Sequence, residues 1–234
     1  VSQSDLEAIA NAITEIYRSR GYYLSRAIVP PQDVHGGHLR IKIIEGSIAE
    51  VRIEGAGADE FGVKEHLDPL TAEHPARLAT VERQFLLAND TPGMRIADTA
   101  LEELGTGSGR FRLIVKVETW GIYESVGLDS YGSHAVGPLQ AYSSTFFNSY
   151  FAKGDTLNLN LSTVPDATRD LRYGRLSYSV PVGPGGVRLG ATISRGEVWP
   201  DDDRRQFDTH TINQSYEVHG SFSPIESRHS ALTI

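Results

Sequence analysis

Residues 18–46 read RSRGYYLSRAIVPPQDVHGGHLRIKIIEG and join the end of a helix to a strand through a proline-containing loop. Gly21 stands where a left-handed residue commonly ends a helix, and residues 22–24 (YYL) then predict a short extended run. Residues 30–31 are prolines, which cannot donate backbone hydrogen bonds, so we expect this part to lie outside any strand ladder. Alternating apolar and basic residues over 39–43 then predict a half-buried strand.

An amphipathic helix is predicted immediately before this stretch. Residues 4–7 (SDLE) fit a capping box, in which a serine and a glutamate satisfy backbone groups of the first helical turn. Apolar residues then recur at helical spacing along one face, namely Leu6, Ile9, Ile13, Ile16 and Tyr17. With a turn at residues 35–37 (HGG), the first unit is predicted to be one helix covering a small sheet.

A second small unit is predicted between residue 48 and residue 119. The expected elements are a strand over 50–54, a helix over 61–67, a helix capped by Thr80, a turn over 89–93 and a strand over 113–117. Residues 97–104 (ADTALEEL) have helical propensity, although the order of elements suggests that part of this segment is a strand. The order β-α-α-β-β predicts a small α+β unit.

From Gly121 onward the apolar residues follow a period of two. One set alternates with asparagines in the segment TLNLNLS, and another alternates with polar and small residues in VRLGATIS. This alternation is typical of a transmembrane β-strand of about 9–11 residues, and a soluble antiparallel sandwich alternates in the same way. The residues predicted to face lipid are Leu157, Leu159, Leu161, Val187, Leu189 and Ile193.

One segment departs from the alternation. Leu171 and Tyr173 lie on one phase, whereas Leu176 and Tyr178 lie on the other. A β-bulge near Gly174 would bring both sets onto one face, because a bulge adds one residue to one strand of a pair. We therefore expect a bulge there.

Composition excludes several classes of function. The chain has 234 residues and a formal net charge of -8, which speaks against a general nucleic-acid binder. It has no cysteine, so a disulfide framework and a thiolate metal site are both excluded. More than half of the aromatic residues follow Trp120, where the helical periodicity ends, and this predicts the main domain boundary.

No motif for catalysis, metal binding or a cofactor is convincing. Residues 105–109 (GTGSG) lack the lysine and hydroxyl residue of a phosphate loop, so a hairpin turn is predicted. Residues 201–203 (DDD) lack the spacing of a calcium loop, and His35 and His38 have no evident third ligand. We therefore expect no enzyme, no metal site and no cofactor.

Several stretches resemble the TpsB transporters, the outer-membrane partners of two-partner secretion. Residues 17–55, which contain GYYLSRAIVPPQD, and residues 81–96 (VERQFLLANDTPGMRI) resemble the POTRA region of that family. Residues 126–159 and 171–194 resemble the opening strands of the attached barrel. Residues 223–234 (SPIESRHSALTI) resemble the start of a further strand.

The resemblance implies α+β POTRA domains followed by antiparallel strands of an incomplete transmembrane β-barrel. The implied domains are a first POTRA domain without its first strand at 1–47, a second at 48–119, and barrel strands at 120–234. The arginine-bearing loop motif of the family's barrel lumen is not in the sequence. We therefore expect a piece of a longer protein, located in the outer membrane with its POTRA domains in the periplasm.

The resemblance also implies a client. POTRA sheets offer a strand edge and a helix-lined groove to an extended chain, which is β-augmentation. The residues predicted to contact the client are Tyr22, Tyr23, Arg83, Phe85, Leu113 and Val115. The alternative for the last three is a purely structural role in the core.

The implied function is export of an unfolded, TpsA-like exoprotein through the barrel, with outer-membrane lipid around the strands. Two alternatives stay open: a factor that assembles and inserts other barrel proteins, and a soluble β-rich adhesin module. The segment GYYLSRAIVPPQD and the count of two POTRA units favour secretion over assembly. No nucleic-acid partner is expected.

Overall fold

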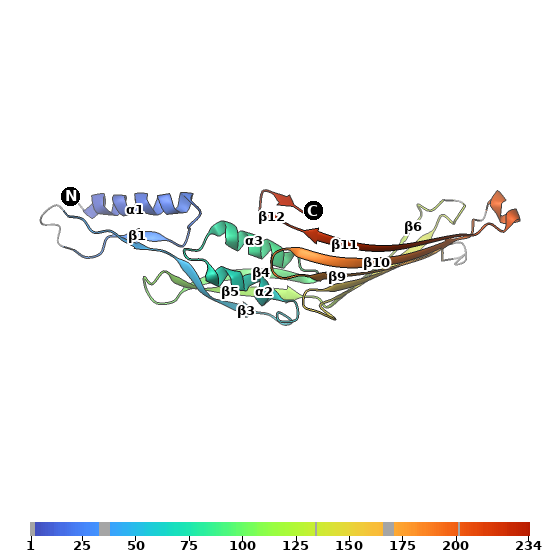
Figure 1. Ribbon diagram of the computed structural model, residues 1–234, viewed down its shortest axis with the longest axis horizontal. Coiled ribbons are helices and arrows are strands. Elements are labelled where there is room, and N and C mark those ends of the chain that lie inside the picture. The colour runs from blue at the N-terminus through green and yellow to red at the C-terminus, as the bar shows by residue number, and fades with distance from the viewer. Residues whose placement is uncertain (1–2, 33–37, 134, 166–170, 201) are drawn as a thin grey trace.

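The computed structural model describes residues 3–32, 38–133, 135–165, 171–200 and 202–234. The molecule is elongated, with the N-terminal helix at one end and the strands of a large sheet extending to the other (Figure 1). A compact α/β unit lies between them (Figure 1). No helix in the described residues is long and apolar enough to cross a membrane, a result that bears on helices alone.

The first unit consists of α1 (Gln3–Ser19), β1 (Arg26–Ile28) and β2 (Lys42–Ile44), with the two strands antiparallel. Ala10 and Thr14 are the buried residues of α1, and the Thr14 hydroxyl accepts the Ala27 N–H at 3.0 Å. The predicted helix and second strand are both present, but the strand is shorter than expected and buries Ile44 instead of Ile43, and Ile9 and Ile16 of the predicted helical stripe are exposed. The predicted turn at 35–37 lies outside the described residues.

Two local predictions in this unit were wrong. Residues 22–24 form a turn, because the Tyr22 N–H bonds back to the Tyr17 carbonyl at 3.0 Å and the Ser25 N–H bonds to the Tyr22 carbonyl at 3.1 Å. Ser4 lies within α1, which already includes Gln3, so it does not occupy the predicted capping position.

The second unit has the predicted order of elements, β-α-α-β-β. Its elements are β3 (Ser47–Glu54), α2 (Val63–Leu67), a 3-10 helix (Asp68–Ala72), α3 (Leu78–Asn89), β4 (Met94–Glu103) and β5 (Arg110–Thr119). The three strands form one sheet in the order β3-β5-β4, with β3 parallel and β4 antiparallel to β5. The loop at 105–109 joins β4 to β5, as expected for a hairpin turn.

In the second unit, the fourth element follows the order of elements against its local propensity, and one predicted helix cap is wrong. Residues 97–103 belong to β4, so pairing with β5 overrides their helical propensity. The helix α3 begins at Leu78 after Arg77, whose backbone is extended, and Thr80 therefore lies inside the helix instead of capping it.

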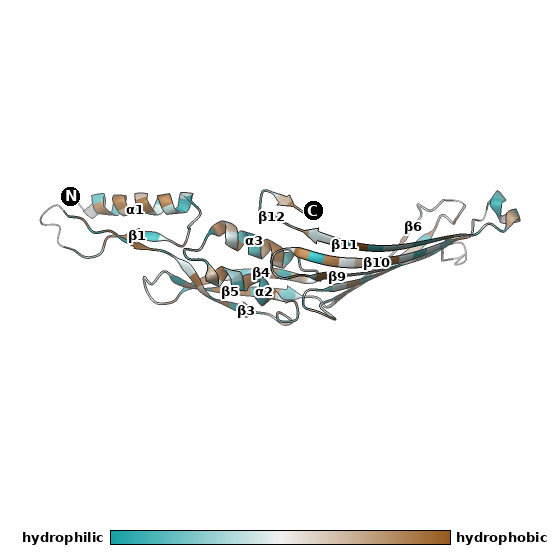
Figure 2. Ribbon diagram, in the orientation of Figure 1, coloured by the Kyte–Doolittle hydropathy of each residue, from teal (hydrophilic) through white to brown (hydrophobic). Residues whose placement is uncertain are grey.

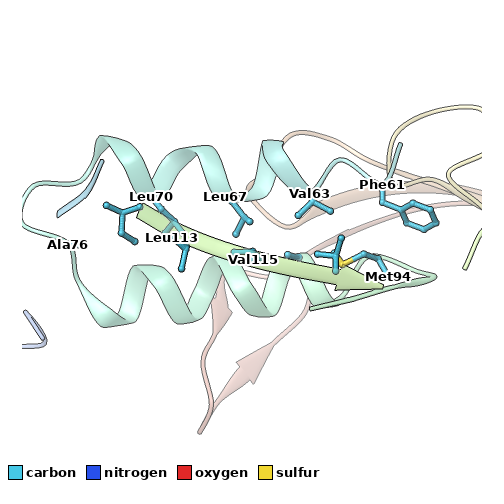
Figure 3. Close-up of a cluster of buried hydrophobic side chains, with 11 residues drawn as sticks. Phe61, Val63, Leu67, Leu70, Ala76, Met94, Leu113 and Val115 are labelled. Atoms are coloured by element: carbon cyan, nitrogen blue, oxygen red, sulfur yellow. The ribbon is translucent and has the colours of Figure 1, made fainter. Parts of the chain in front are cut away.

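The core of the second unit lies between its helices and one face of the sheet (Figure 3). Phe61, Val63, Leu67 and Leu70 come from the helical side, and β5 contributes Leu113 and Val115, as Figure 3 shows. The opposite face of the sheet is charged. There Arg112 forms ion pairs with both Glu50 and Glu102.

The C-terminal half is a six-stranded antiparallel sheet in which each strand pairs with the next along the chain. The strands are β6 (Ile122–Asp129), β7 (Gln140–Asn148), β8 (Thr156–Thr163), β9 (Leu171–Pro181), β10 (Val187–Val198) and β11 (Thr211–Phe222). The sheet is not closed: within the described residues, the outer edges of β6 and β11 have no ladder partner. A short hairpin of β12 (Ile225–Glu226) and β13 (Ala231–Leu232) follows and contacts α3.

The register of β9 is continuous with both of its neighbours, so the bulge expected near Gly174 is absent. Gly174 pairs with Leu161, and Leu176 pairs with Leu159. Leu171 and Tyr173 therefore lie on the opposite face of the sheet from Leu176. The break in the apolar pattern marks Leu171 and Tyr173 as residues of the opposite face, which also carries Phe146 beside Asn158, and no extra residue is needed to explain it.

Candidate functional site

The six residues predicted to face lipid lie on one face of the six-stranded sheet. Leu159 pairs with Leu176, which in turn pairs with Ile193, so the apolar residues of β8, β9 and β10 share that face. Val126 on β6 and Val218 on β11 belong to the same face by register. We call this surface the apolar face, with members Val126, Leu128, Leu157, Leu159, Leu161, Leu176, Val187, Leu189, Ile193, Tyr216 and Val218.

The apolar face is exposed. Leu161, Leu189 and Ile193 are each about half exposed, at 48%, 52% and 49%, and Val218 on the edge strand is 88% exposed. Figure 2 shows the underlying alternation of hydrophobic and hydrophilic residues along β10. A sheet in water buries its apolar face against another layer, and within the described residues no layer covers this one.

The opposite face is polar and its side chains bond to one another. The Ser144 hydroxyl donates to Asn160 Oδ1 at 2.8 Å and accepts from Asn158 Nδ2 at 3.1 Å. Thr192 on β10 donates to the Ser177 hydroxyl at 3.1 Å and is only 6% exposed, whereas its apolar neighbour Ile193 is half exposed. We call this surface the polar face. Along β10 the side chains of the polar face are less exposed than those of the apolar face. The wall of a transmembrane β-barrel has the same arrangement, with polar residues inside and apolar residues outside.

The turn between β7 and β8 is built around a fully buried carboxylate. Asp155 accepts backbone N–H groups of Tyr150, Phe151 and Ala152 at 2.9, 3.2 and 2.8 Å. Its Oδ2 also accepts the hydroxyl of Tyr178 on β9 at 2.8 Å. Carboxylates that accept several hydrogen bonds hold such turns rigidly. This turn therefore forms a fixed base of the sheet at its end near the α/β unit.

The helices of the second unit dock onto the same end of the sheet, at several of its turns. Arg83 on α3 donates hydrogen bonds to the carbonyls of Gly185, Ser223 and Pro224 at 3.1, 3.0 and 3.3 Å. On α2, Glu65 pairs with Lys153 of the β7–β8 turn at 2.7 Å, and this hydrogen bond raises the pKa of Lys153. The α/β unit and the sheet are therefore joined by specific polar contacts from both helices.

A glycine allows the β9–β10 turn to approach α3 closely at this joint. Gly186, in the turn between β9 and β10, has a φ of +82°, and a Cβ atom there would lie 2.8 Å from Leu87 Cδ2 of α3. A larger residue at this position would therefore strain the backbone and displace the buried Leu87 side chain.

Two titratable groups of the second unit lie close to the same joint. Burial lowers the pKa of His66 on α2, and the positive charge of Arg188 on β10 acts in the same direction. Burial raises the pKa of Asp90, which follows α3. The Nδ1 atom of His66 is buried without a hydrogen-bond partner in the described part of the chain. Protonating His66 therefore costs free energy in the docked state.

The predicted client-contacting residues do not form one site. Tyr22 is half-buried between the two POTRA-like units, where Arg77 Nε donates to its hydroxyl at 3.2 Å, while Tyr23 beside it is 56% exposed. The Arg83 guanidinium donates its hydrogen bonds to backbone carbonyls at the joint with the sheet. Leu113 and Val115 are buried in the core of the second unit, and Phe85 is partly buried against that core.

An exposed strand edge was missed by sequence reasoning. The strand β4 is an edge of its sheet, and Leu101 on it is 50% exposed although it shares the core side with its partner Leu113. Leu78, at the start of α3, is 37% exposed, and α3 and β4 run in opposite directions, which places both residues at the same end of the unit. The signal was hidden because Leu101 lies within ADTALEEL, whose propensity is helical.

Neither a metal site nor a phosphate loop is formed by the described residues. Among them, no three side chains of His, Cys, Asp and Glu gather in a way that could hold a metal ion. Of the triple aspartate, residue 201 lies outside the described residues, and Asp203 begins a 3-10 helix (Asp203–Phe207) in the β10–β11 connection. His35 also lies outside them.

Comparison with known proteins identifies one matching family model and several similar transporter proteins. A family model described as POTRA domain, ShlB-type, matches residues 1–46. The chain is 29% identical over 199 residues to the heme/hemopexin transporter protein HuxB of Haemophilus influenzae (strain 86-028NP), covering 83% of this chain and 34% of HuxB. It is 27% identical over 184 residues to the outer membrane transporter CdiB of Escherichia coli, covering 76% of this chain and 30% of that protein.

A solved structure has the same fold. The structure of CdiB from Escherichia coli matches with a TM-score of 0.72 and 22% identity, covering 97% of this chain and 42% of that one. The chain spans about a third of the length of the curated relatives it matches. The outer membrane, with POTRA domains in the periplasm, is the location of such transporters and is assigned to this chain on that basis. The chain is therefore similar to transporter proteins such as HuxB and CdiB, with a match to a ShlB-type POTRA domain over residues 1–46 and a partial barrel-like sheet after Trp120.

Proposed function

We propose that this chain is part of a transporter that exports a large protein across the outer membrane by two-partner secretion. The observation that carries the proposal is the six-stranded sheet, whose exposed apolar face lies opposite a hydrogen-bonded polar face. The apolar face contacts lipid through Leu157, Leu159, Leu161, Val187, Leu189 and Ile193. The polar face lines the route of the exported chain.

Capture of the client takes place at the POTRA units. An unfolded exoprotein segment pairs with an exposed strand edge, since backbone hydrogen bonds add affinity without requiring a folded partner. The free edge of β4, with Leu101 half exposed beside α3, supports this role. Tyr23 adds an exposed aromatic surface nearby in the first unit.

The other residues predicted to contact the client have supporting structural roles and do not touch the client at the β4 edge. Tyr22 sets the angle between the two units, Arg83 fixes α3 to the sheet, and Phe85 packs against the core of the second unit. Leu113 and Val115 hold the sheet against its helices from that core. The proposed division is 1–47 and 48–119 for the POTRA units and 120–234 for the barrel strands.

The experiment compares two neighbouring residues of β4 in the complete transporter. Leu101→Ala should weaken binding of an unfolded exoprotein fragment about fivefold, since burying the exposed half of a leucine contributes on the order of 1 kcal/mol. Ala100→Ser, on the opposite face of the same strand, should leave binding unchanged. Binding is measured by titration in detergent, and secretion by the amount of exoprotein in the medium.

Two other functions make different predictions. A barrel-assembly factor would restore insertion of unrelated outer-membrane proteins in a depleted strain and would secrete no exoprotein. A soluble adhesin module would leave residues 120–234 monomeric and cooperatively folded in water without detergent. Either result would replace the transport proposal.

A further inference from the structure

A groove of about 1040 Å³ crosses the apolar face at the end of the sheet far from the POTRA units. Two adjacent rows of side chains line it, running across β6 to β10. The rows start at Val126 and Leu128 on β6 and end at Arg195 and Glu197 on β10. Five strands spaced about 4.8 Å apart make the groove about 19 Å long.

Small residues stand on both sides of the central strand of the groove. Ala141 and Ser143 line it from β7 and Gly174 lines it from β9, while β8 between them contributes Leu161 and Thr163. A Cβ atom at Gly174 would meet nothing nearer than Leu161 Cδ2 at 3.7 Å, and its backbone is outside the left-handed region. Neither packing nor backbone geometry therefore requires glycine here. The missing side chain leaves room that the described chain does not fill.

One end of the groove is basic. Arg172 and Arg195 stand on adjacent strands within the two rows, and Arg195 Nε donates to Glu197 Oε1 at 2.7 Å. Arg172, Arg195 and Glu197 are the charged residues in the lining of the groove, so basic groups outnumber acidic ones there. The Arg172 guanidinium lies 5.7 Å from the centre of the Trp199 ring, which stacks on His210 at 4.2 Å. Aromatic side chains of this kind commonly mark the level of membrane head groups.

We propose that this groove binds a phosphorylated glycolipid of the outer leaflet, with acyl chains in the apolar part and a phosphate at Arg172 and Arg195. The proposal rests on the proposed function, because it requires the apolar face to lie in the membrane and the POTRA units in the periplasm. Guanidinium groups match phosphate in shape and charge. A groove that spans five strands suits a lipid with several acyl chains better than one with two.

The test uses the complete transporter in detergent and lipid A as the probe, with binding measured by native mass spectrometry. Arg172→Gln combined with Arg195→Gln should weaken binding about tenfold or more, because charge-assisted hydrogen bonds to the phosphate are lost. Gly174→Leu should weaken it without changing charge, by filling the groove. Glu197→Gln should strengthen binding, because it removes the carboxylate that competes for Arg195. Arg204→Gln, near the tip and paired with Asp202, is the matched control and should have no effect.

Three results would overturn the proposal: equal binding by the wild type and the double arginine variant, equal binding of dephosphorylated lipid A, or equal binding of phosphatidylglycerol. Wild-type protein that forms a dimer in place of the lipid complex would overturn it as well. Exoprotein secretion is measured for the same variants. A transporter that secretes normally but binds no lipid A contradicts the groove proposal alone, whereas one that neither inserts into membranes nor secretes contradicts the proposed function.

Discussion

His66 makes the stability of the docked POTRA unit depend on pH. Burial lowers its pKa below the ordinary value of 6.5, with Arg188 adding to the shift and with the Asp90 and Glu65 carboxylates opposing it. The folded state therefore binds fewer protons than the unfolded state between that lowered pKa and 6.5. Stability contributed by neutral His66 is present above about pH 6.5 and is lost as the pH falls through this window.

Thermal unfolding of the intact protein between pH 5.5 and 7.5 checks this expectation. The wild-type Tm should fall as the pH is lowered, and His66→Gln should flatten the profile because the titrating group is gone. Asp90→Asn should extend the fall in Tm to lower pH, since it removes a carboxylate that opposes the lowering of the His66 pKa. A wild-type profile as flat as that of His66→Gln would show that His66 does not titrate in the docked unit.

Single residues were predictable where a local period defined their surroundings. Leu159 and Ile193 share a face because side chains of a strand alternate, and that follows from spacing alone. The role of Arg83 did not follow, because its partners Ser223 and Pro224 lie 140 and 141 residues away in the sequence. No local pattern marks a contact of that range.

At the scale of elements, the two faces of β8 should respond differently to charge. Leu159→Arg should cost about 2–4 kcal/mol of unfolding free energy if the residue lies near the bilayer midplane. Asn160→Arg, one residue along on the polar face, should cost less than Leu159→Arg, because its charge would not face lipid. Denaturant unfolding from lipid vesicles measures both, and equal costs would show that Leu159 does not face lipid.

The joint between α3 and the sheet is a second element-scale prediction. Arg83→Ala removes three hydrogen bonds to backbone carbonyls, and hydrogen bonds from a charged group contribute about 1.5–3 kcal/mol. Amide hydrogen exchange in α3 and in residues 223–226 should therefore become faster. Arg228→Ala breaks the ion pair between the exposed Arg228 side chain and the half-buried Glu82, and it should change exchange less than Arg83→Ala, since ion pairs near the surface contribute about 0–1 kcal/mol. Equal exchange in both variants would contradict the anchoring role of Arg83.

Elements were predicted best where propensity and periodicity agreed. The strand at β5 and the helix α1 followed from their apolar spacing, whereas β4 has a sequence of helical propensity. Pairing with β5 along most of its length determines the conformation of β4, and that partner is not visible from residues 94–103 alone. The bulge expected near Gly174 was wrong for a related reason: apolar residues on the polar face imitate a shift in register.

At the scale of the whole molecule, the POTRA-like units lie toward one end, and the six-stranded sheet, with one apolar and one polar face, runs to the other end (Figure 1). The order of these parts was predictable from changes in periodicity along the chain. The polar contacts that join them, and the groove across five strands, were not, because each depends on residues brought together only by the folded sheet.

The central claim is that the apolar face lies in lipid and the polar face lines an aqueous interior. Because these 234 residues contain no cysteine, single cysteines can be placed without background, after any cysteine elsewhere in the complete transporter is replaced. Leu159→Cys and Asn160→Cys, in the complete protein in outer membranes, would be labelled with a charged maleimide and with a lipid-soluble one. We predict that the charged reagent labels only Asn160→Cys and that Leu159→Cys reacts only with the lipid-soluble reagent. Labelling of Leu159→Cys by the charged reagent as readily as Asn160→Cys would contradict this account.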